Sequence, residues 1–241
     1  MLSQKRGNLS NYALSIIIPT LNEEGNIDLL VNEIMNQKNA NEWEIIFVDD
    51  NSNDRTLAKI KKNSNRFNNI KYIDRKKNRS LSLSCVEGFK KANSEYILVM
   101  DADLQHHPKY INILFEKIKS ERLDIVVASR FLSNDSQINF SFIRKKISLI
   151  AVYLANIFID IKLTDPLSGF FVISKEYLSH VIKNLDNKGF KILLEIIIKS
   201  SKKPKMNEQP IDFNSRVSGK SKLSLSVILD FLRILLLKYI R

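Results

Sequence analysis

Two aspartates, Asp101 and Asp103, stand two residues apart directly after the apolar run YILVM at 96–100. Carboxylate oxygens are the ligands that Mg²⁺ and Mn²⁺ prefer, and these ions keep coordination positions open for phosphate oxygens. Gln105 continues the spacing with another oxygen ligand. Because residues i and i+2 of an extended backbone face the same side, the pair could address one ion. The spacing therefore predicts a site for Mg²⁺ or Mn²⁺ and a phosphorylated ligand.

The neighbouring His106 and His107 raise zinc as an alternative metal. Zinc sites combine histidines with cysteines or with further histidines. The chain has one cysteine and three histidines in all, so no such cluster accompanies this pair. We interpret both histidines as loop or packing residues, and a solvated acidic turn remains the alternative to a metal site.

Short apolar runs alternate with amphipathic segments in the first half of the chain, which is typical of an α/β fold with a mostly parallel central sheet flanked by helices. The predicted strands are 14–19, 44–50, 70–74, 96–101 and 124–129. The predicted helices are 24–37, 54–65, 82–93 and 108–120. In such a sheet, ligands bind outside the carboxyl ends of the strands. Three polar clusters follow strands and are expected to meet there: 19–23, 49–50 and 101–103.

Two common nucleotide-binding patterns are missing from the sequence. The six glycines are not spaced as in a dinucleotide fingerprint, and no GK[ST] loop follows the first strand. Taken alone, the stretch DDNS at 49–52 would be interpreted as a strand-to-helix turn, because its residues favour helix caps. Three acidic clusters at one end of a sheet instead favour a metal that holds the phosphates.

The formal net charge of +12 in 241 residues favours an anionic partner, such as nucleic acid, a phosphorylated substrate or an acidic membrane surface. Nucleic acid is disfavoured because the basic residues are not interleaved with an aromatic or helix-turn-helix pattern. The single Cys85 excludes an internal disulfide and fits a reducing compartment. We expect no secretory signal, and no run reaches the roughly 18 to 20 apolar residues of a membrane-spanning helix.

The second half of the chain is less regular. It predicts an apolar helix over about 141–161, a loop over 163–171, a helix over 189–200 and a short strand near Ile211. The organisation expected is one domain over 1–222, which includes the helix at 141–161, followed by a C-terminal amphipathic helix over 223–241.

The C-terminal helix has one polar arc on an otherwise apolar circumference. That arc holds Ser226, Asp230, Arg233 and Arg241. Such a wide apolar face predicts that the helix lies in a lipid interface, with the helix at 141–161 beside it. The alternative is a helix packed on the protein core or on a partner.

The ordered motifs carry a resemblance to a known family. They are LSIIIPTLNEEGNI (14–27), VDDNSNDRT (48–56), VMDADLQHHP (99–108), ASRF (128–131), DPLSGFFVI (165–173), GFKILLE (189–195) and RVSGKSKLS (216–224). Over nearly its whole length the chain resembles the family 2 glycosyltransferases, and within them the polyprenol (dolichyl) phosphate mannose synthases. The resemblance implies the nucleotide-sugar-binding fold called GT-A. It also implies transfer of mannose from GDP-mannose to a polyprenyl (dolichyl-type) monophosphate, with inversion to a β-linked product and Mg²⁺ or Mn²⁺ as cofactor.

The resemblance also assigns roles to residues by their places in these motifs. Donor-binding residues are expected to be Pro19, Leu21, Glu23, Asp50, Asp101, Ala102 and Asp103, with Arg216 and Lys222 on a loop that closes over the donor. The expected metal ligands are Asp101, Asp103 and Gln105. The acceptor phosphate is expected at Arg130, Arg144 and Ser148. Catalysis is expected to depend on Asp103, Arg130 and Arg144.

The implied partners are GDP-mannose, a polyprenyl phosphate lipid and a membrane surface, without nucleic acid. A separate membrane-anchoring subunit stays open, and the expected location is peripheral, on the cytoplasmic face of a membrane. Two other functions remain as alternatives. One is a UDP-glucose-dependent polyprenyl phosphate glucosyltransferase, and the other is a non-catalytic basic module at a membrane surface.

Overall fold

The computed structural model describes residues 12–132, 142–186, 188–213 and 225–236, with the backbone alone for 142–145 and 225–229. The strands are β1 (Leu14–Thr20), β2 (Trp43–Asp49), β3 (Ile70–Asp74), β4 (Tyr96–Val99), β5 (Ile125–Ser129), β6 (Phe171–Ser174) and β7 (Met206–Pro210). The α-helices are α1 (Ile27–Met35), α2 (Thr56–Arg66), α3 (Leu81–Lys91), α4 (Tyr110–Ser120), α5 (Phe142–Phe158), α6 (Lys175–Val181), α7 (Ile192–Lys199) and α8 (Leu225–Leu236). Two short 3₁₀ helices are η1 (Ala40–Glu42) and η2 (Ile182–Asn184).

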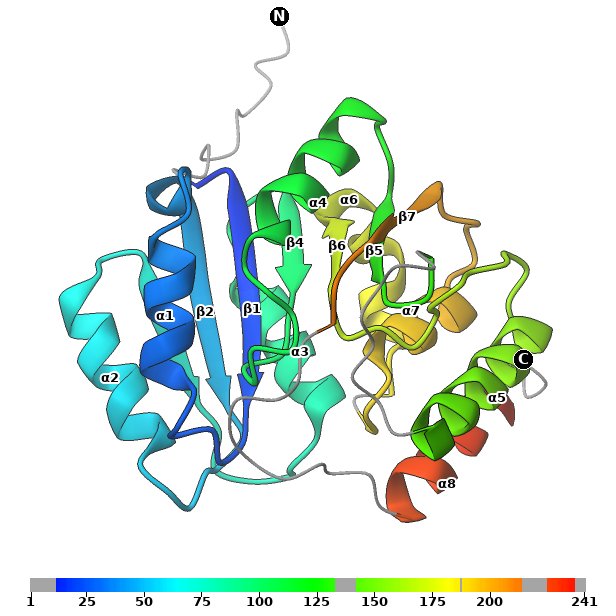
Figure 1. Ribbon diagram of the computed structural model, residues 1–241, viewed down its shortest axis with the longest axis horizontal. Coiled ribbons are helices and arrows are strands. Elements are labelled where there is room, and N and C mark those ends of the chain that lie inside the picture. The colour runs from blue at the N-terminus through cyan, green and yellow to red at the C-terminus, as the bar shows by residue number, and fades with distance from the viewer. Residues whose placement is uncertain (1–11, 133–141, 187, 214–224, 237–241) are drawn as a thin grey trace, which may run out of the picture.

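The described strands form one sheet of seven, in the order β3-β2-β1-β4-β6-β5-β7 (Figure 1). All pairs are parallel except those of β6, which runs antiparallel to both β4 and β5. Alternate residues of β1 enter two cores: Ile16 and Ile18 face α1, α2 and α4, while Ile17 faces α3, α5, α6, α7 and α8. Both faces of the sheet are therefore covered, as the continuous apolar runs predict.

The structure differs from the predicted elements mainly in the second half. Residues 163–171 were expected to form a loop, but Phe171 begins β6, a strand of four residues that directly follows the loop motif. The strand expected near Ile211 is β7, which ends one residue earlier and lies on an edge of the sheet. β4 ends at Val99 rather than at residue 101.

The described part of α8 packs on the protein. Phe231, Ile234 and Leu235 are buried in the core, and Leu232 and Leu236 remain exposed. Arg233 of the polar arc also contacts protein, because its Nη1 lies 3.9 Å from Asp186 Oδ2. Packing on the core, the alternative stated for this helix, thus accounts for three of the five apolar side chains described in it.

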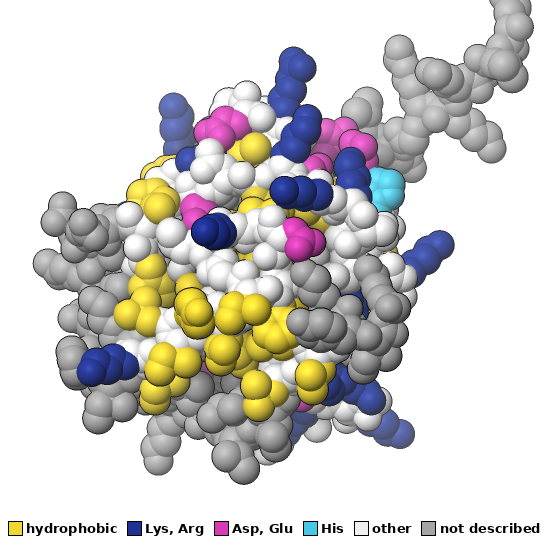
Figure 2. Space-filling view, turned by 90° about the vertical axis from the view of Figure 1, so that its right-hand side faces the viewer, with side chains coloured by type: hydrophobic (Ala, Val, Ile, Leu, Met, Phe, Trp, Pro, Cys, Tyr) yellow, Lys and Arg dark blue, Asp and Glu magenta, His cyan; other side chains and the backbone are white. Residues whose placement is uncertain are grey.

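The outer face of α5 is apolar and exposed (Figure 2). Tyr153 is 69% exposed, Ile150 is 60% exposed, and Ile147 and Ile157 are also more than half exposed. Beside them, a groove of about 560 Å³ runs between α5 and residues 162–164. No described helix is both long and apolar enough to cross a membrane.

A buried carboxylate, Glu44, ties the amino ends of β1, β2 and β3 to the loop before β4. The Ser15 hydroxyl and the Asn93 amide each donate to Oε1 at 2.6 Å, and the Lys71 ammonium donates to Oε2 at 2.6 Å. Burial alone would raise the pKa of Glu44, but these hydrogen bonds lower it overall. The network lies far from the carboxyl ends of the strands, so we assign it to stability.

Glu44→Gln should lower the free energy of unfolding at neutral pH by about 2 kcal/mol, because it removes the charge from a buried hydrogen-bond network. The folded-state pKa of Glu44 lies below its ordinary value of 4.5. Its stabilisation is therefore present above pH 4.5 and is lost as the pH falls through the folded-state pKa. Urea unfolding at neutral and acidic pH measures the difference, with the exposed Glu42→Gln as control. Equal stability of Glu44→Gln and wild type at neutral pH would contradict this role.

Candidate active site

The carboxyl ends of three adjacent strands bring the predicted polar clusters together. Because β1 lies between β2 and β4, residues 19–23, 49–50 and 101–103 share one edge of the sheet. The Asp50 amide donates to the Thr20 carbonyl at 2.8 Å, and the Thr20 hydroxyl donates to Asp49 Oδ1 at 3.2 Å. The convergence expected from the strand pattern is therefore present in the structure.

The turns that follow β1 and β2 are bonded to each other. The Asn22 amide donates to the Ser52 hydroxyl at 2.9 Å, and the Asn53 amide donates to Asn22 Oδ1 at 2.9 Å. Asn22 has a φ of 55° and Asn51 a φ of 61°, a left-handed conformation that asparagine tolerates better than most residues. Pro19 is buried in β1, while Leu21 and Glu23 are half-buried in the turn beyond it.

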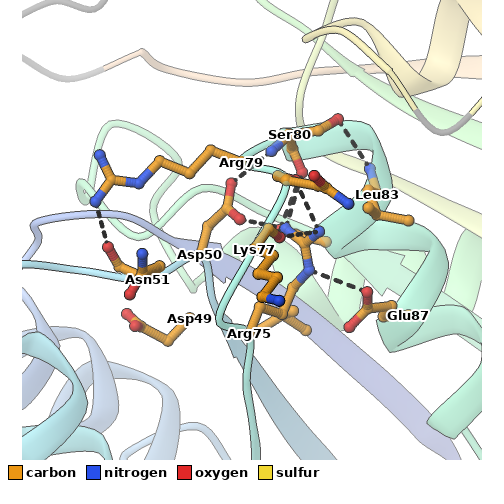
Figure 3. Close-up of polar contacts among 12 residues, drawn as sticks. Asp49, Asp50, Asn51, Arg75, Lys77, Arg79, Ser80, Leu83 and Glu87 are labelled. Atoms are coloured by element: carbon orange, nitrogen blue, oxygen red, sulfur yellow. Dashed lines mark hydrogen bonds and ion pairs between the residues drawn. The ribbon is translucent and has the colours of Figure 1, made fainter.

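Asp50 forms an ion pair with the buried Arg75 (Figure 3). Its Oδ1 accepts from Arg75 Nη1, and its Oδ2 accepts from the Ser80 amide at 2.8 Å. Arg75 also donates to Glu87 Oε1 at 3.0 Å and to the Ser84 hydroxyl at 3.0 Å. Burial raises the pKa of Asp50, whereas the Arg75 charge opposes the rise. Both carboxylate oxygens of Asp50 are thus engaged within the protein, and sequence reasoning had missed Arg75.

The two carboxylates after β4 have different surroundings. The Asp101 side chain is 40% exposed, whereas Asp103 is 4% exposed and its Oδ1 accepts from the Gln105 amide at 3.1 Å. The backbone bends at 102–105, with a φ of 61° at Leu104, so the extended stretch that would align the pair is missing. Ala102 is buried between them.

Gly169 allows the loop before β6 to approach Asp101. A Cβ at this position would lie 2.9 Å from Asp101 Oδ2, closer than real Cβ contacts allow. Any larger residue at 169 would therefore push against the Asp101 carboxylate.

The buried His106 packs between two aromatic rings. Its ring lies 5.1 Å from that of Phe170 and 5.5 Å from that of Phe213. Burial lowers the pKa of His106 to about 4, so the imidazole is neutral at pH 7. The ring contacts agree with the interpretation of His106 as a packing residue, and its Nδ1 also lies 3.6 Å from Asp101 Oδ2. Within the described residues, no three His, Cys, Asp or Glu side chains gather to hold a metal.

Arg130, which follows β5, is anchored by the buried Asp165. Its Nε donates to Asp165 Oδ2 at 2.6 Å, and its Nη2 donates to Oδ1 at 2.8 Å. Asp165 is fully buried, and its amide donates to Glu208 Oε1 at 3.0 Å. This bidentate geometry fixes the orientation of the guanidinium. Asp165 was not among the predicted site residues, although it opens the DPLSGFF motif.

The remaining predicted residues are only partly within the described chain. Ser148 is half-buried on α5. The backbone of Arg144 belongs to the same helix, but its side chain lies outside the described residues. Arg216 and Lys222 also lie outside them.

Relatives of the chain are found over most of its length. The family model described as "Glycosyl transferase family 2" matches residues 15–182. The chain is 42% identical over 224 residues to a dolichol-phosphate mannosyltransferase of Pyrococcus furiosus, covering 91% of this chain and 62% of that protein. It is 32% identical over 231 residues to the Saccharomyces cerevisiae protein of the same name, covering 91% and 84%. The chain thus spans less than two thirds of the archaeal relative.

Solved structures share the fold at low sequence identity. Glucosyl-3-phosphoglycerate synthase from Mycobacterium tuberculosis, in complex with Mn²⁺, UDP-glucose and phosphoglyceric acid, matches with a TM-score of 0.68 at 14% identity. The match covers 94% of this chain and 79% of that one. Residues 1–349 of S. aureus TarS match with a TM-score of 0.60 at 17% identity, covering 95% and 65%. The expected GT-A fold is confirmed, and the chain belongs to glycosyl transferase family 2.

Proposed function

We propose that this chain transfers mannose from GDP-mannose to a polyprenyl (dolichyl-type) monophosphate, with inversion at the anomeric carbon. The observation that carries the proposal is that one loop, residues 165–169, lies against two charged groups. Gly169 lies beside the partly exposed Asp101 carboxylate, and Asp165 anchors Arg130. A partly exposed carboxylate and a fixed cation thus lie at one edge of the sheet, which supports a site for a metal ion and a phosphate. The names of the archaeal and yeast relatives support the choice of sugar and acceptor.

A divalent metal is part of the proposal. Asp101, Asp103 and Gln105 offer oxygen ligands alone, which suit Mg²⁺ or Mn²⁺. When bound, such an ion would neutralise charge on the donor diphosphate. The Mn²⁺ in the M. tuberculosis structure supports this cofactor class.

Charge governs the proposed mechanism. A polyprenyl phosphate has a second pKa of about 6, so it is largely a dianion at neutral pH. Such a nucleophile needs no strong general base, but its repulsion from the donor diphosphate must be offset. Arg130 supplies positive charge from the ligand edge, and the resemblance adds Arg144 and Arg216. In-line attack would then invert the α-linked donor to a β-linked product.

The exposed face of α5 supports a peripheral membrane location. A row of apolar side chains flanked by Lys146 and Lys162 is typical of a helix that lies in a lipid interface. This face would bring the site to the phosphate of a lipid whose tail stays in the bilayer. We further propose that the protein binds the cytoplasmic face of that membrane, and a separate anchoring subunit stays open.

Incubation with GDP-mannose, Mg²⁺ or Mn²⁺ and a short polyprenyl phosphate should yield a mannosylated lipid, detected by its mass. UDP-glucose in place of GDP-mannose should yield little product. A product formed only from UDP-glucose would overturn the choice of donor. Failure of both sugar nucleotides, with retained vesicle binding, would favour the non-catalytic module.

Asp103→Asn should lower turnover by orders of magnitude, because it removes a charged metal ligand and with it about 3 kcal/mol or more of transition-state stabilisation. The fold should persist, since the side-chain oxygen of asparagine can still accept the hydrogen bond from the Gln105 amide. Circular dichroism and thermal unfolding check the fold, and single-turnover kinetics measure the loss. Near-normal turnover in a folded variant would remove Asp103 from the metal site.

The double variant Ile150→Glu with Ile157→Glu should bind anionic vesicles at least about tenfold more weakly, because burying one such side chain contributes about 1.5 kcal/mol or more. GDP-mannose binding should not change. The matched control is Leu29→Glu with Ile113→Glu, exposed apolar residues on α1 and α4. Vesicle sedimentation that is equal in both double variants would rule out α5 as the lipid-binding face.

A further inference from the structure

One short loop, residues 165–169, contacts three charged groups of the candidate site. Asp165 binds Arg130, and Gly169 makes room for the Asp101 carboxylate. Between these two, the Leu167 carbonyl accepts a hydrogen bond from Lys191 Nζ at 3.4 Å. The loop therefore holds Lys191 at the same edge of the sheet as Asp101 and Arg130.

The ammonium of Lys191 lacks the partners that other half-buried lysines of this chain have. Lys71 donates to Glu44 at 2.6 Å, and Lys199 forms an ion pair with Asp186. Lys191 has one long hydrogen bond to a carbonyl, and among the described residues no carboxylate oxygen lies within 4.0 Å of it. An ammonium has three N–H donors, and the described residues accept a hydrogen bond from one of them.

The surroundings of Lys191 are suited to an anion. Burial lowers its pKa, the Arg130 charge lowers it further, and Asp101 and Asp165 oppose both effects. The bidentate pair with Asp165 offsets part of the Arg130 charge. Lys191 is therefore the cation of this group whose charge is least compensated by contact.

We propose that Lys191 binds the β-phosphate of the sugar nucleotide and stabilises the charge on the departing nucleoside diphosphate. This inference rests on the proposed function. A metal on Asp101 would hold the diphosphate beside the loop 165–169, within reach of the ammonium. In the transfer, an oxygen of the acceptor phosphate forms a bond to the anomeric carbon. The bond from that carbon to the β-phosphate oxygen breaks, and its electron pair stays on the diphosphate, where Lys191 meets the added charge.

The test compares ligands with and without the β-phosphate. Titration calorimetry with Mg²⁺ measures the Kd of GDP and of GMP for wild type, Lys191→Met and Lys191→Arg. Lys191→Met should weaken GDP binding about tenfold or more, because a charge-assisted hydrogen bond is lost, and should leave GMP binding unchanged. Lys191→Arg should recover part of the loss. Unchanged GMP binding also shows that the variant is folded.

Lys188→Met is the matched control, because Lys188 is exposed and lies three residues away. It should bind GDP and GMP as wild type does. An equal loss of GDP and GMP affinity in Lys191→Met would overturn the proposal, as would unchanged GDP binding. The same series with UDP and UMP separates the two levels of inference. If wild type binds only the uridine nucleotides, the proposed donor is wrong. The comparison of UDP with UMP in wild type and Lys191→Met then still tests the role of Lys191.

Discussion

The Asp165 carboxylate has no exposed surface, and a buried carboxylate is stable only when it is paired and hydrogen-bonded. Arg130 meets this requirement with two side-chain N–H groups and its own backbone amide. From the other side, Glu208 on β7 accepts from the amides of Thr164 and Asp165. The path of the loop, the direction of Arg130 and the position of the Leu167 carbonyl all depend on this ion pair.

The direction of β6 explains why that loop reaches the ligand edge. β6 is antiparallel to β4, so its first residue, Phe171, pairs with Val99, the last residue of β4. The segment that leads into β6 must therefore lie beside the segment that leaves β4. A parallel strand in this position would have brought its carboxyl end here, and the loop 165–169 would lie at the opposite end of the sheet.

The sequence predicts the strands and helices whose apolar residues follow a clear local pattern. The run LSIIIPT is recognisable as a strand covered on both faces because its apolar residues are continuous, and all seven residues are buried. Phe171–Ser174 escaped prediction because four residues after a loop motif carry little periodicity. The helical wheel of residues 223–241 located the polar arc, but could not show that Arg233 meets Asp186.

The residues that form ion pairs with Asp50 and Arg130 could not be predicted from the sequence, because each lies far away along the chain. Asp50 and Arg75 are 25 residues apart, and Arg130 and Asp165 are 35 apart. Motif spacing identified Asp50 and Arg130 as polar residues at strand ends, yet only the packed sheet shows which opposite charge lies against each. These pairs fix the orientation of Asp50 and of Arg130, which motif spacing alone does not show.

The apolar face of α5 also bears on how this protein behaves in solutions without lipid. Tyr153, Ile150 and their neighbours form a contiguous patch that water solvates poorly. In detergent-free buffer, two copies can shield this surface by placing it face to face, and the attraction grows with concentration. Chromatographic size measured without an amphiphile would then report the cohesion of this patch, rather than an assembly state built into the fold.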